Sequence, residues 1–151
     1  MAWLEHFSGE GPWSIGAGSI LRDEGDAVFS PANSYGYMDG GIDLAYRTHF
    51  GPGIQTLLQR VINSRFGGVL SVGEAVIIPT QDARIPLMIA APTMERPSDV
   101  RDTQNAYRAM RAGLLEVMTV PGALVLGGDT EVVLDDEVFG KPRDEADAAA
   151  M

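Results

Sequence analysis

The chain is organised around residues 26 to 43, whose sequence is Asp26-Ala-Val-Phe-Ser-Pro-Ala-Asn-Ser-Tyr-Gly-Tyr-Met-Asp-Gly-Gly-Ile-Asp43. The apolar run Ala27-Val-Phe29 fits a buried strand of an α/β sheet better than an exposed strand. Pro31 lacks an N–H group and favours extended geometry in the residue before it, so we expect the strand to end at Ser30.

The polar and glycine residues after this strand predict a place for an anionic ligand. Asn33 is the first polar side chain beyond the expected strand end. Gly36, Gly40 and Gly41 allow the backbone to take positive φ and to approach a ligand closely. A helix that begins near Ile42 would point its first N–H groups at the same space, which favours phosphate. Ligands of open α/β sheets bind outside the carboxyl ends of the strands, where these residues are expected to lie.

The rest of the chain alternates helical and extended patterns. We expect a turn and a strand over Gly16–Leu21, a helix from about Ile42 to a stop at Gly51-Pro-Gly53, and a second helix from about Ile54 to Phe66. An extended segment follows over Val69–Pro79, then a polar turn, a strand over Leu87–Ala91, and a third helix over Gln104–Met118 with Met110 in the core.

The composition is that of a soluble globular domain. The chain has 151 residues, of which 45% are hydrophobic and 21% charged, so one domain of ordinary size is expected. The net charge of -10 argues against a nucleic-acid partner, because such binding depends on Lys and Arg neutralising phosphates. A single nucleotide remains compatible with this charge, since backbone N–H groups can hold a diphosphate in an acidic protein.

Several kinds of site are disfavoured by what the sequence lacks. It contains no cysteine, which leaves no disulfide, thiolate nucleophile or Cys-ligated zinc. His6 and His49 have no second ligand at metal-binding spacing, so we predict no metal site. Met1–Trp13 carries no continuous apolar segment, so we expect neither a secretory signal nor a membrane partner, and by default a cytoplasmic location.

Several blocks of the sequence resemble one known family. Ser30-Pro-Ala-Asn33 followed by Gly40-Gly-Ile-Asp43 resembles the signature of macro domains, the ADP-ribose-binding family. The resemblance continues through Gly73–Pro79 and Ala106–Arg108 and covers roughly residues 18 to 118. It implies a three-layer α/β/α fold with a mixed central sheet.

Beyond Met118 the resemblance fades. Pro121–Gly128 could supply a strand and two glycines, and Glu131–Leu134 one last strand. We therefore expect the C-terminal part of the fold to be abbreviated or remodelled. The predicted organisation is a single macro-like domain over residues 1–143 and an acidic, frayed tail over residues 144–151.

The resemblance also implies a ligand and a set of site residues. The expected partner is ADP-ribose or an ADP-ribosylated molecule, with no cofactor. Ser19 stands where the family has an aspartate that accepts a hydrogen bond from the adenine amino group, which puts adenine selectivity in doubt. The residues expected to bind the ligand are Ser19, Ile20, Ala32, Asn33, Gly40, Gly41 and Ile42.

The catalytic expectation concerns Asn33 and Asp43. Asp43 follows Asn33 by ten residues, the spacing of macro domains that hydrolyse ADP-ribosyl esters. The resemblance implies that Asp43 activates a water and that Asn33 positions sugar hydroxyls. The alternatives are that Asp43 satisfies N–H groups at the helix start and that Asn33 caps the glycine loop.

Two residues depart from the family's usual loop. Met38 and Asp39 stand where further glycines often occur, and Asp39 places a negative charge beside the expected diphosphate unless its carboxylate turns outward. Three hypotheses remain open: an ADP-ribosyl hydrolase or O-acyl-ADP-ribose deacylase, a non-catalytic ADP-ribose-binding module, and a degenerate macro-like fold without nucleotide binding. The oligomeric state is not predicted.

Overall fold

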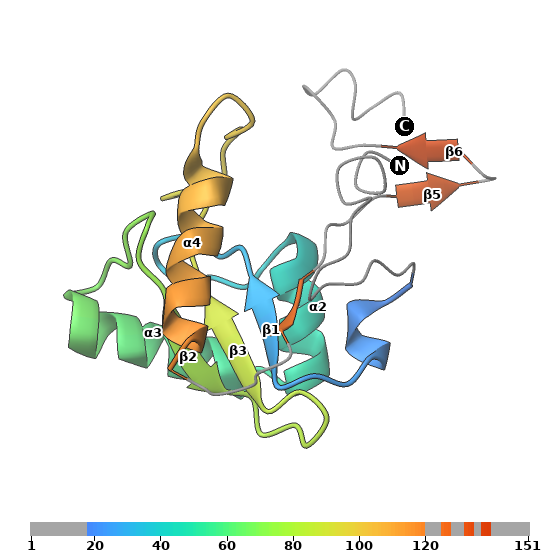
Figure 1. Cartoon of the computed structure of the whole chain (residues 1–151), viewed down its shortest axis with the longest axis horizontal. Coiled ribbons are helices and arrows are strands. Elements are labelled where there is room, and N and C mark those ends of the chain that lie inside the picture. The colour runs from blue at the N-terminus through green and yellow to red at the C-terminus, as the bar shows by residue number, and fades with distance from the viewer. Residues whose placement is uncertain (1–17, 120–124, 128–131, 135–136, 140–151) are drawn as a thin grey trace.

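The computed structural model describes residues 18–119, 125–127, 132–134 and 137–139 (Figure 1). The described elements, in chain order, are the 3₁₀ helix η1 (Ile20–Arg22), β1 (Ala27–Ser30), α2 (Gly41–Phe50), α3 (Gly53–Phe66), β2 (Val76–Pro79), β3 (Leu87–Ala90), α4 (Asn105–Val117), β4 (Val125–Leu126), β5 (Val132–Leu134) and β6 (Glu137–Phe139). The helices α2, α3 and α4 and the strands β1 and β3 are therefore confirmed with small differences at their ends, whereas only Val76–Pro79 of the extended segment expected over Val69–Pro79 forms a strand.

The central sheet has four strands in the order β2-β3-β1-β4. β1 runs parallel to both of its neighbours, with Ala27 opposite Leu87 on β3 and opposite Val125 on β4. β2 pairs with β3 in antiparallel fashion, which the short connection between them permits. The sheet is therefore mixed, as the resemblance to macro domains implied.

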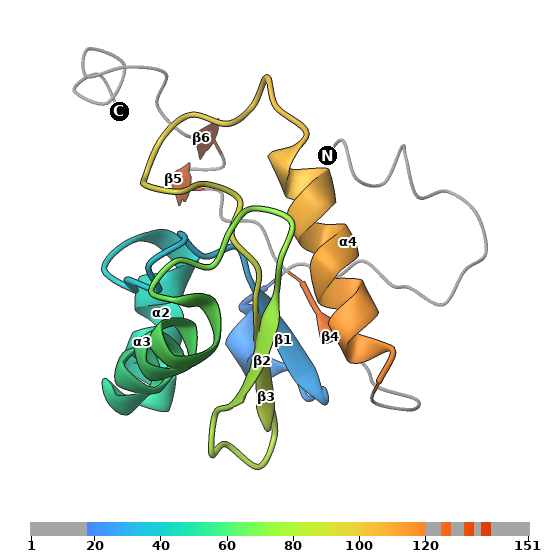
Figure 2. The ribbon, with the colours of Figure 1, turned by 90° about the vertical axis from the view of Figure 1, so that its left-hand side faces the viewer.

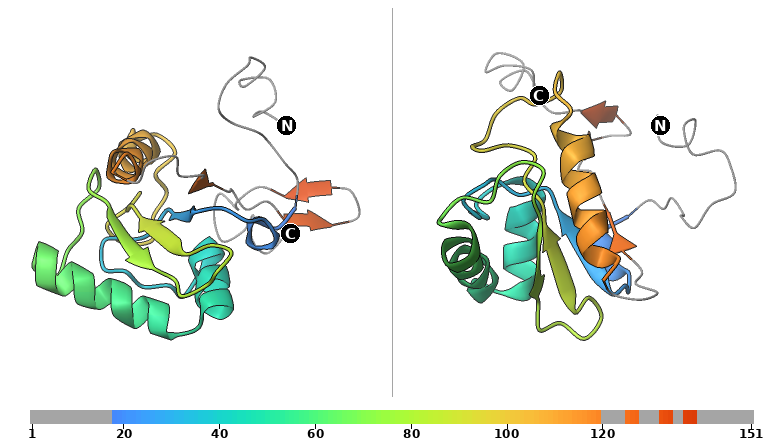
Figure 3. Two further views of the ribbon diagram at one scale, coloured as in Figure 1. Left: turned by 60° about the horizontal axis from the view of Figure 1, so that its bottom comes forward. Right: turned by 60° about the vertical axis from the view of Figure 1, so that its left-hand side comes forward.

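Helices cover both faces of this sheet. Figure 2 shows α2 and α3 on one side and α4 on the other, and the two views in Figure 3 show the same three layers. Val28 packs into a core cluster with Tyr46 of α2 and Leu58 of α3, whereas Phe29 packs into a second cluster with Ala109 of α4. Neighbouring residues of a strand point to opposite faces, so all of β1 is buried. The predicted α/β/α layering is confirmed.

The helix α4 packs on the sheet through small residues. Its buried positions are Ala109, Ala112, Gly113 and Val117. A Cβ atom at Gly113 would lie 2.3 Å from Cε2 of Phe29, so the ring fills the space that a side chain would need. The prediction that Met110 belongs to the core is wrong, because 44% of its surface is exposed. The bulky ring of Phe29 requires the helix to present its small-residue face instead.

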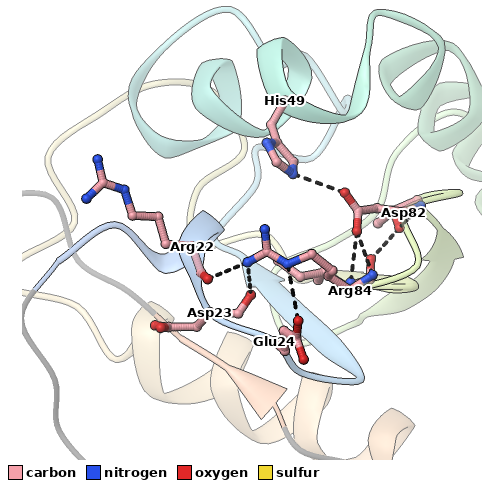
Figure 4. Close-up of polar contacts among 8 residues, drawn as sticks. Arg22, Asp23, Glu24, His49, Asp82 and Arg84 are labelled. Carbon is pink, nitrogen blue, oxygen red and sulfur yellow. Dashed lines mark hydrogen bonds and ion pairs between the residues drawn. The ribbon is translucent and has the colours of Figure 1, made fainter.

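A polar cluster ties the turn between β2 and β3 to the start of β1 (Figure 4). The guanidinium group of Arg84 donates to the carbonyl oxygens of Arg22 and Asp23 and lies 3.6 Å from Glu24. On the other side of the turn, Asp82 Oδ2 lies 3.1 Å from Nε2 of His49 at the end of α2. Side chains of this turn thus connect the end of the sheet to the segment before β1 and to α2.

Two expectations near the chain ends differ from the structure. Within Gly16–Leu21, the described residues form a bend and the start of η1 rather than a strand, and Ile20 packs against the core on the α2 and α3 face. The last strand predicted at Glu131–Leu134 is present as β5, but it pairs with β6 in a separate two-stranded sheet. Residues 144–151 lie outside the described residues.

Candidate ligand-binding site

The carboxyl ends of three parallel strands meet at one edge of the sheet. β1 ends at Ser30, β3 at Ala90 and β4 at Leu126. Past the strand ends the backbones stay together, since the N–H of Ala91 donates to the carbonyl oxygen of Ser30 and that of Thr93 to the carbonyl oxygen of Ala32, both at 3.1 Å. The loop that leads from β1 to α2 therefore lies at the edge where ligands of α/β sheets bind.

The start of α2 offers free backbone donors at this edge. No side chain caps the helix, and the first backbone bond at its start runs from the N–H of Leu44 to the carbonyl oxygen of Gly40. Among the described residues, the N–H groups of Gly40, Gly41 and Ile42 have no acceptor. A Cβ atom added at Gly40 or Gly41 would find no atom within 4 Å, so the space in front of them is open. Free N–H groups and the helix dipole suit an anion.

The loop before these glycines is anchored to α2 and α3. The side chain of Met38 is buried, and its N–H donates to Oε1 of Gln55 on α3 at 2.9 Å. The carboxylate of Asp39 forms an ion pair with Arg47 on α2. The two residues that replace the expected glycines therefore fix the loop to α2 and α3.

The side chain of Asn33 closes its own turn. Its Oδ1 accepts hydrogen bonds from the N–H groups of Tyr35 at 3.1 Å and Tyr37 at 3.2 Å, and its Nδ2 donates to the carbonyl oxygen of Tyr37 at 2.7 Å. This is the arrangement of the capping alternative. One N–H of the Asn33 amide has no acceptor among the described residues, so a donor at this edge is still free.

Asp43, in the first turn of α2, is buried rather than exposed. Its Oδ1 accepts a hydrogen bond of 2.5 Å from Oγ of Ser30, and only 8% of the residue is exposed. Burial raises the pKa of Asp43, and the Ser30 hydrogen bond opposes this increase. The nearby hydroxyl of Tyr46 donates to the carbonyl oxygen of Phe29 at 3.1 Å, and burial together with the Asp43 charge raises the pKa of Tyr46. Asp43 therefore ties α2 to β1 and does not cap the helix.

The remaining predicted ligand residues are divided between surface and core. Ser19 is exposed and precedes η1, where its carbonyl oxygen accepts the N–H of Arg22 at 3.0 Å. Ile20 and Ile42 are half-buried against the core, and Ala32 is buried. The structure thus brings together Ala32, Asn33 and the start of α2 at one edge.

Sequence reasoning missed Ser30, Arg47 and Gln55, which position Asp43, Asp39 and Met38. No local sequence motif predicts these contacts, because each contact joins residues of different elements. In the described part of the chain, no group of three or more His, Cys, Asp or Glu side chains could hold a metal ion. No helix among the same residues is long and apolar enough to span a membrane.

A separate hollow lies at the opposite end of the sheet. It measures about 380 Å³ and is lined by the start of α3, including Arg60, and by Thr80 and Gln81 of the β2–β3 turn. Because the parallel strands begin at this end, the hollow is distinct from the edge with the free N–H groups.

The fold is a mixed α/β sheet covered by helices on both faces, with acceptor-free N–H groups beyond the end of β1. The family model of the macro domain matches residues 29–120, which is more than half of the chain. The chain belongs to the macro domain family.

Solved structures with the same fold are macrodomains. The macrodomain of Mycobacterium tuberculosis DarG matches with a TM-score of 0.58 and 20% identity, over 71% of this chain and 68% of that chain. A mutant macrodomain from Oceanobacillus iheyensis, solved with ADPR, matches with a TM-score of 0.56 and 19% identity, over 67% of this chain and 56% of that chain.

Comparison with curated proteins gives similarities of two different lengths. A stretch of 47 residues is 55% identical to a dTTP/UTP pyrophosphatase from Xanthomonas euvesicatoria, covering 30% of this chain and 25% of that protein. An uncharacterized protein from Aquifex aeolicus is 28% identical over 112 residues, which is 70% of this chain and 64% of that protein. The chain thus spans about a quarter of the length of the matched Xanthomonas pyrophosphatase.

Proposed function

We propose that this protein binds ADP-ribose, or an ADP-ribosylated molecule, at the carboxyl edge of its sheet. The observation that carries the proposal is that the N–H groups of Gly40, Gly41 and Ile42 have no acceptor among the described residues, next to open space on the Cβ side of Gly40 and Gly41. A diphosphate supplies the negatively charged oxygens that such donors prefer, and the helix dipole adds to the attraction.

The spacing of three residue types supports this proposal. Structures of the Oceanobacillus iheyensis macrodomain include substitutions of an asparagine, of a glycine seven residues later and of an aspartate three residues after that. Asn33, Gly40 and Asp43 have the same residue types and spacing. Structures of that macrodomain contain ADPR or ADP, so the corresponding edge here is proposed to take the same class of ligand.

Each part of the ligand then has an assigned contact. The diphosphate lies against Gly40, Gly41 and Ile42, and the free N–H of Asn33 donates to the distal ribose. The base lies toward Ser19 and Ile20. A serine hydroxyl both donates and accepts, so we expect weaker discrimination between adenine and other bases than a carboxylate would give.

The geometry favours binding over catalysis. The carboxylate of Asp43 is buried and bonded to Ser30, and the amide oxygen of Asn33 is bonded within its own turn, so neither oxygen is open to solvent for activating a water molecule. Hydrolysis of an ADP-ribosyl ester remains the reaction to test, because the raised pKa of Asp43 makes its carboxylate a stronger base than an ordinary one. Turnover of such an ester that is lost in Asp43→Asn would establish the enzyme.

A second candidate function is hydrolysis of a nucleoside triphosphate to release pyrophosphate. The similarity to dTTP/UTP pyrophosphatases favours it, although the chain spans only about a quarter of the matched Xanthomonas protein. Incubation with dTTP and UTP, with pyrophosphate as the readout, tests this candidate separately from ADP-ribose binding.

Calorimetric titration with ADP-ribose tests the main proposal. We expect saturable binding by the wild type and strong weakening by Gly40→Glu, whose carboxylate would stand before the helix start and repel the diphosphate. The φ of Gly40 is -154°, so glutamate adopts it without left-handed strain. Gly53→Glu is the charge-matched control, because its Cβ also meets no atom within 4 Å but lies at the start of α3. Wild-type protein that releases no heat and gains no thermal stability would contradict the proposal.

A further inference from the structure

Asp39 places a carboxylate immediately before the glycines that offer their N–H groups. The residue is exposed, with 63% of its side chain accessible. The position of its backbone is fixed, because the neighbouring Met38 is buried in the core and bonded to Gln55. A negative charge at this position repels the diphosphate of the proposed ligand. The direction of the Asp39 side chain therefore matters for affinity.

Arg47 decides that direction. Its guanidinium group pairs with Asp39 Oδ1, and 34% of its side chain is exposed. Arg47 lies six residues after Gly41, which places its Cα about 9 Å further along the axis of α2. The ion pair neutralises the carboxylate, and among the described residues no hydrogen bond joins it to the N–H groups of Gly40 or Gly41.

We propose that Arg47 is a positioning residue that sets the affinity for diphosphate by holding the Asp39 carboxylate away from the N–H groups of Gly40 and Gly41. This inference rests on the proposed function, since it concerns the same ligand. The Asp39 carboxylate repels the diphosphate, and Arg47 reduces this repulsion through the ion pair without contacting the ligand.

A double-mutant cycle with ADP-ribose as the ligand tests this role. We expect Arg47→Ala to weaken binding about fivefold at low salt, the upper end of the range for an exposed ion pair. Asp39→Asn should bind as well as the wild type or slightly better. In the Asp39→Asn background, Arg47→Ala should change the affinity by less than about twofold, because no carboxylate remains to be held.

Arg60→Ala is the matched control for charge. Arg60 is also exposed and helical, but it lies at the opposite end of the sheet beside Thr80 and Gln81. We expect Arg60→Ala to bind ADP-ribose with the affinity of the wild type. The weakening of binding by Arg47→Ala should decrease as the salt concentration rises. Thermal unfolding of each variant checks that it is folded.

Two outcomes would overturn the inference and leave the proposed function intact. Equal weakening by Arg47→Ala in both backgrounds would show that Arg47 contacts the ligand itself. Unchanged affinity of Arg47→Ala would show that the pair has no influence on binding. A wild-type protein that does not bind ADP-ribose would instead contradict the proposed function, and the inferred role of Arg47 would then be wrong as well.

Discussion

The carboxyl group of Asp43 is stabilised in its neutral form by folding. Burial raises its pKa above the 3.8 of an ordinary aspartate, so between these two values the folded chain binds more protons than the unfolded chain. The free energy of unfolding contributed by Asp43 therefore falls as the pH rises through this window.

Replacement of Asp43 by asparagine should remove this pH dependence. The amide keeps an oxygen acceptor for Ser30 but cannot ionise. Urea unfolding of wild type and Asp43→Asn from pH 3.5 to 8 should give a difference in stability that grows in favour of the variant above about pH 3.8 and then levels off. A difference that is constant with pH would contradict a raised pKa.

Loss of the Ser30 hydroxyl should lower the free energy of unfolding at neutral pH. Ser30→Ala removes the hydrogen bond to a buried carboxylate, and we expect it to lower the free energy of unfolding by about 2 kcal/mol at pH 7. Ser64→Ala is the control, because the exposed Ser64 donates only to a carbonyl oxygen of its own helix. Equal effects of the two substitutions in denaturant unfolding would argue against the Ser30–Asp43 contact.

At this scale the sequence located residues but not their partners. The strand end, Pro31 and the glycines placed Asn33 and Asp43 near one edge. The bond from Ser30 to Asp43 joins a strand to a helix across thirteen positions, so no local spacing could predict it. The turn closed by Asn33 is local and was one of the two alternatives that the sequence left open.

Among the elements, α4 shows how a periodic pattern can mislead. The spacing of Ala106, Met110, Leu114 and Val117 predicted the helix, with Met110 in the core. Val117 is buried, but Met110 and Leu114 are 44% and 45% exposed. The helix turns its small residues to the sheet because Phe29 projects from β1 beneath it. Only the sheet surface could have selected this face. The α2 and α3 helices were predicted more closely, since glycines bound both of them.

The close packing of α4 predicts an unusual response to a methyl group. Gly113→Ala should lower the free energy of unfolding by about 1–3 kcal/mol, because its Cβ would meet Phe29 at 2.3 Å and Ile89 at 3.0 Å. Alanine normally stabilises a helix relative to glycine. Gly53→Ala, where space is open, should therefore be neutral or stabilising. Chemical denaturation of both variants measures the contrast, which a stable Gly113→Ala would contradict.

For the whole molecule, the resemblance to macro domains implied the layered fold correctly, and boundary signals located most of its helices and strands. The C-terminal part was less predictable. β4 is only two residues long, yet its parallel pairing with β1 directs Gly127 toward the same edge as Gly40. The division into a domain over residues 1–143 and a tail over residues 144–151 stays a prediction.

Ligand binding should stabilise the whole molecule as well as the loop. If ADP-ribose binds only the folded chain, a concentration of 100 times the dissociation constant should raise the free energy of unfolding by about 2.7 kcal/mol. Denaturant unfolding with and without the ligand measures this increase. Gly53→Glu should show the same increase and Gly40→Glu little of it at the same concentration.

The central claim is that the N–H groups of Gly40, Gly41 and Ile42 receive the diphosphate. Two-dimensional NMR of the ¹⁵N-labelled protein during titration with ADP-ribose observes these groups directly. We predict that their three amide signals shift in a saturable manner, while the amide of Gly53 at the start of α3 does not move. Saturable binding that leaves the signals of Gly40, Gly41 and Ile42 unchanged would contradict the account.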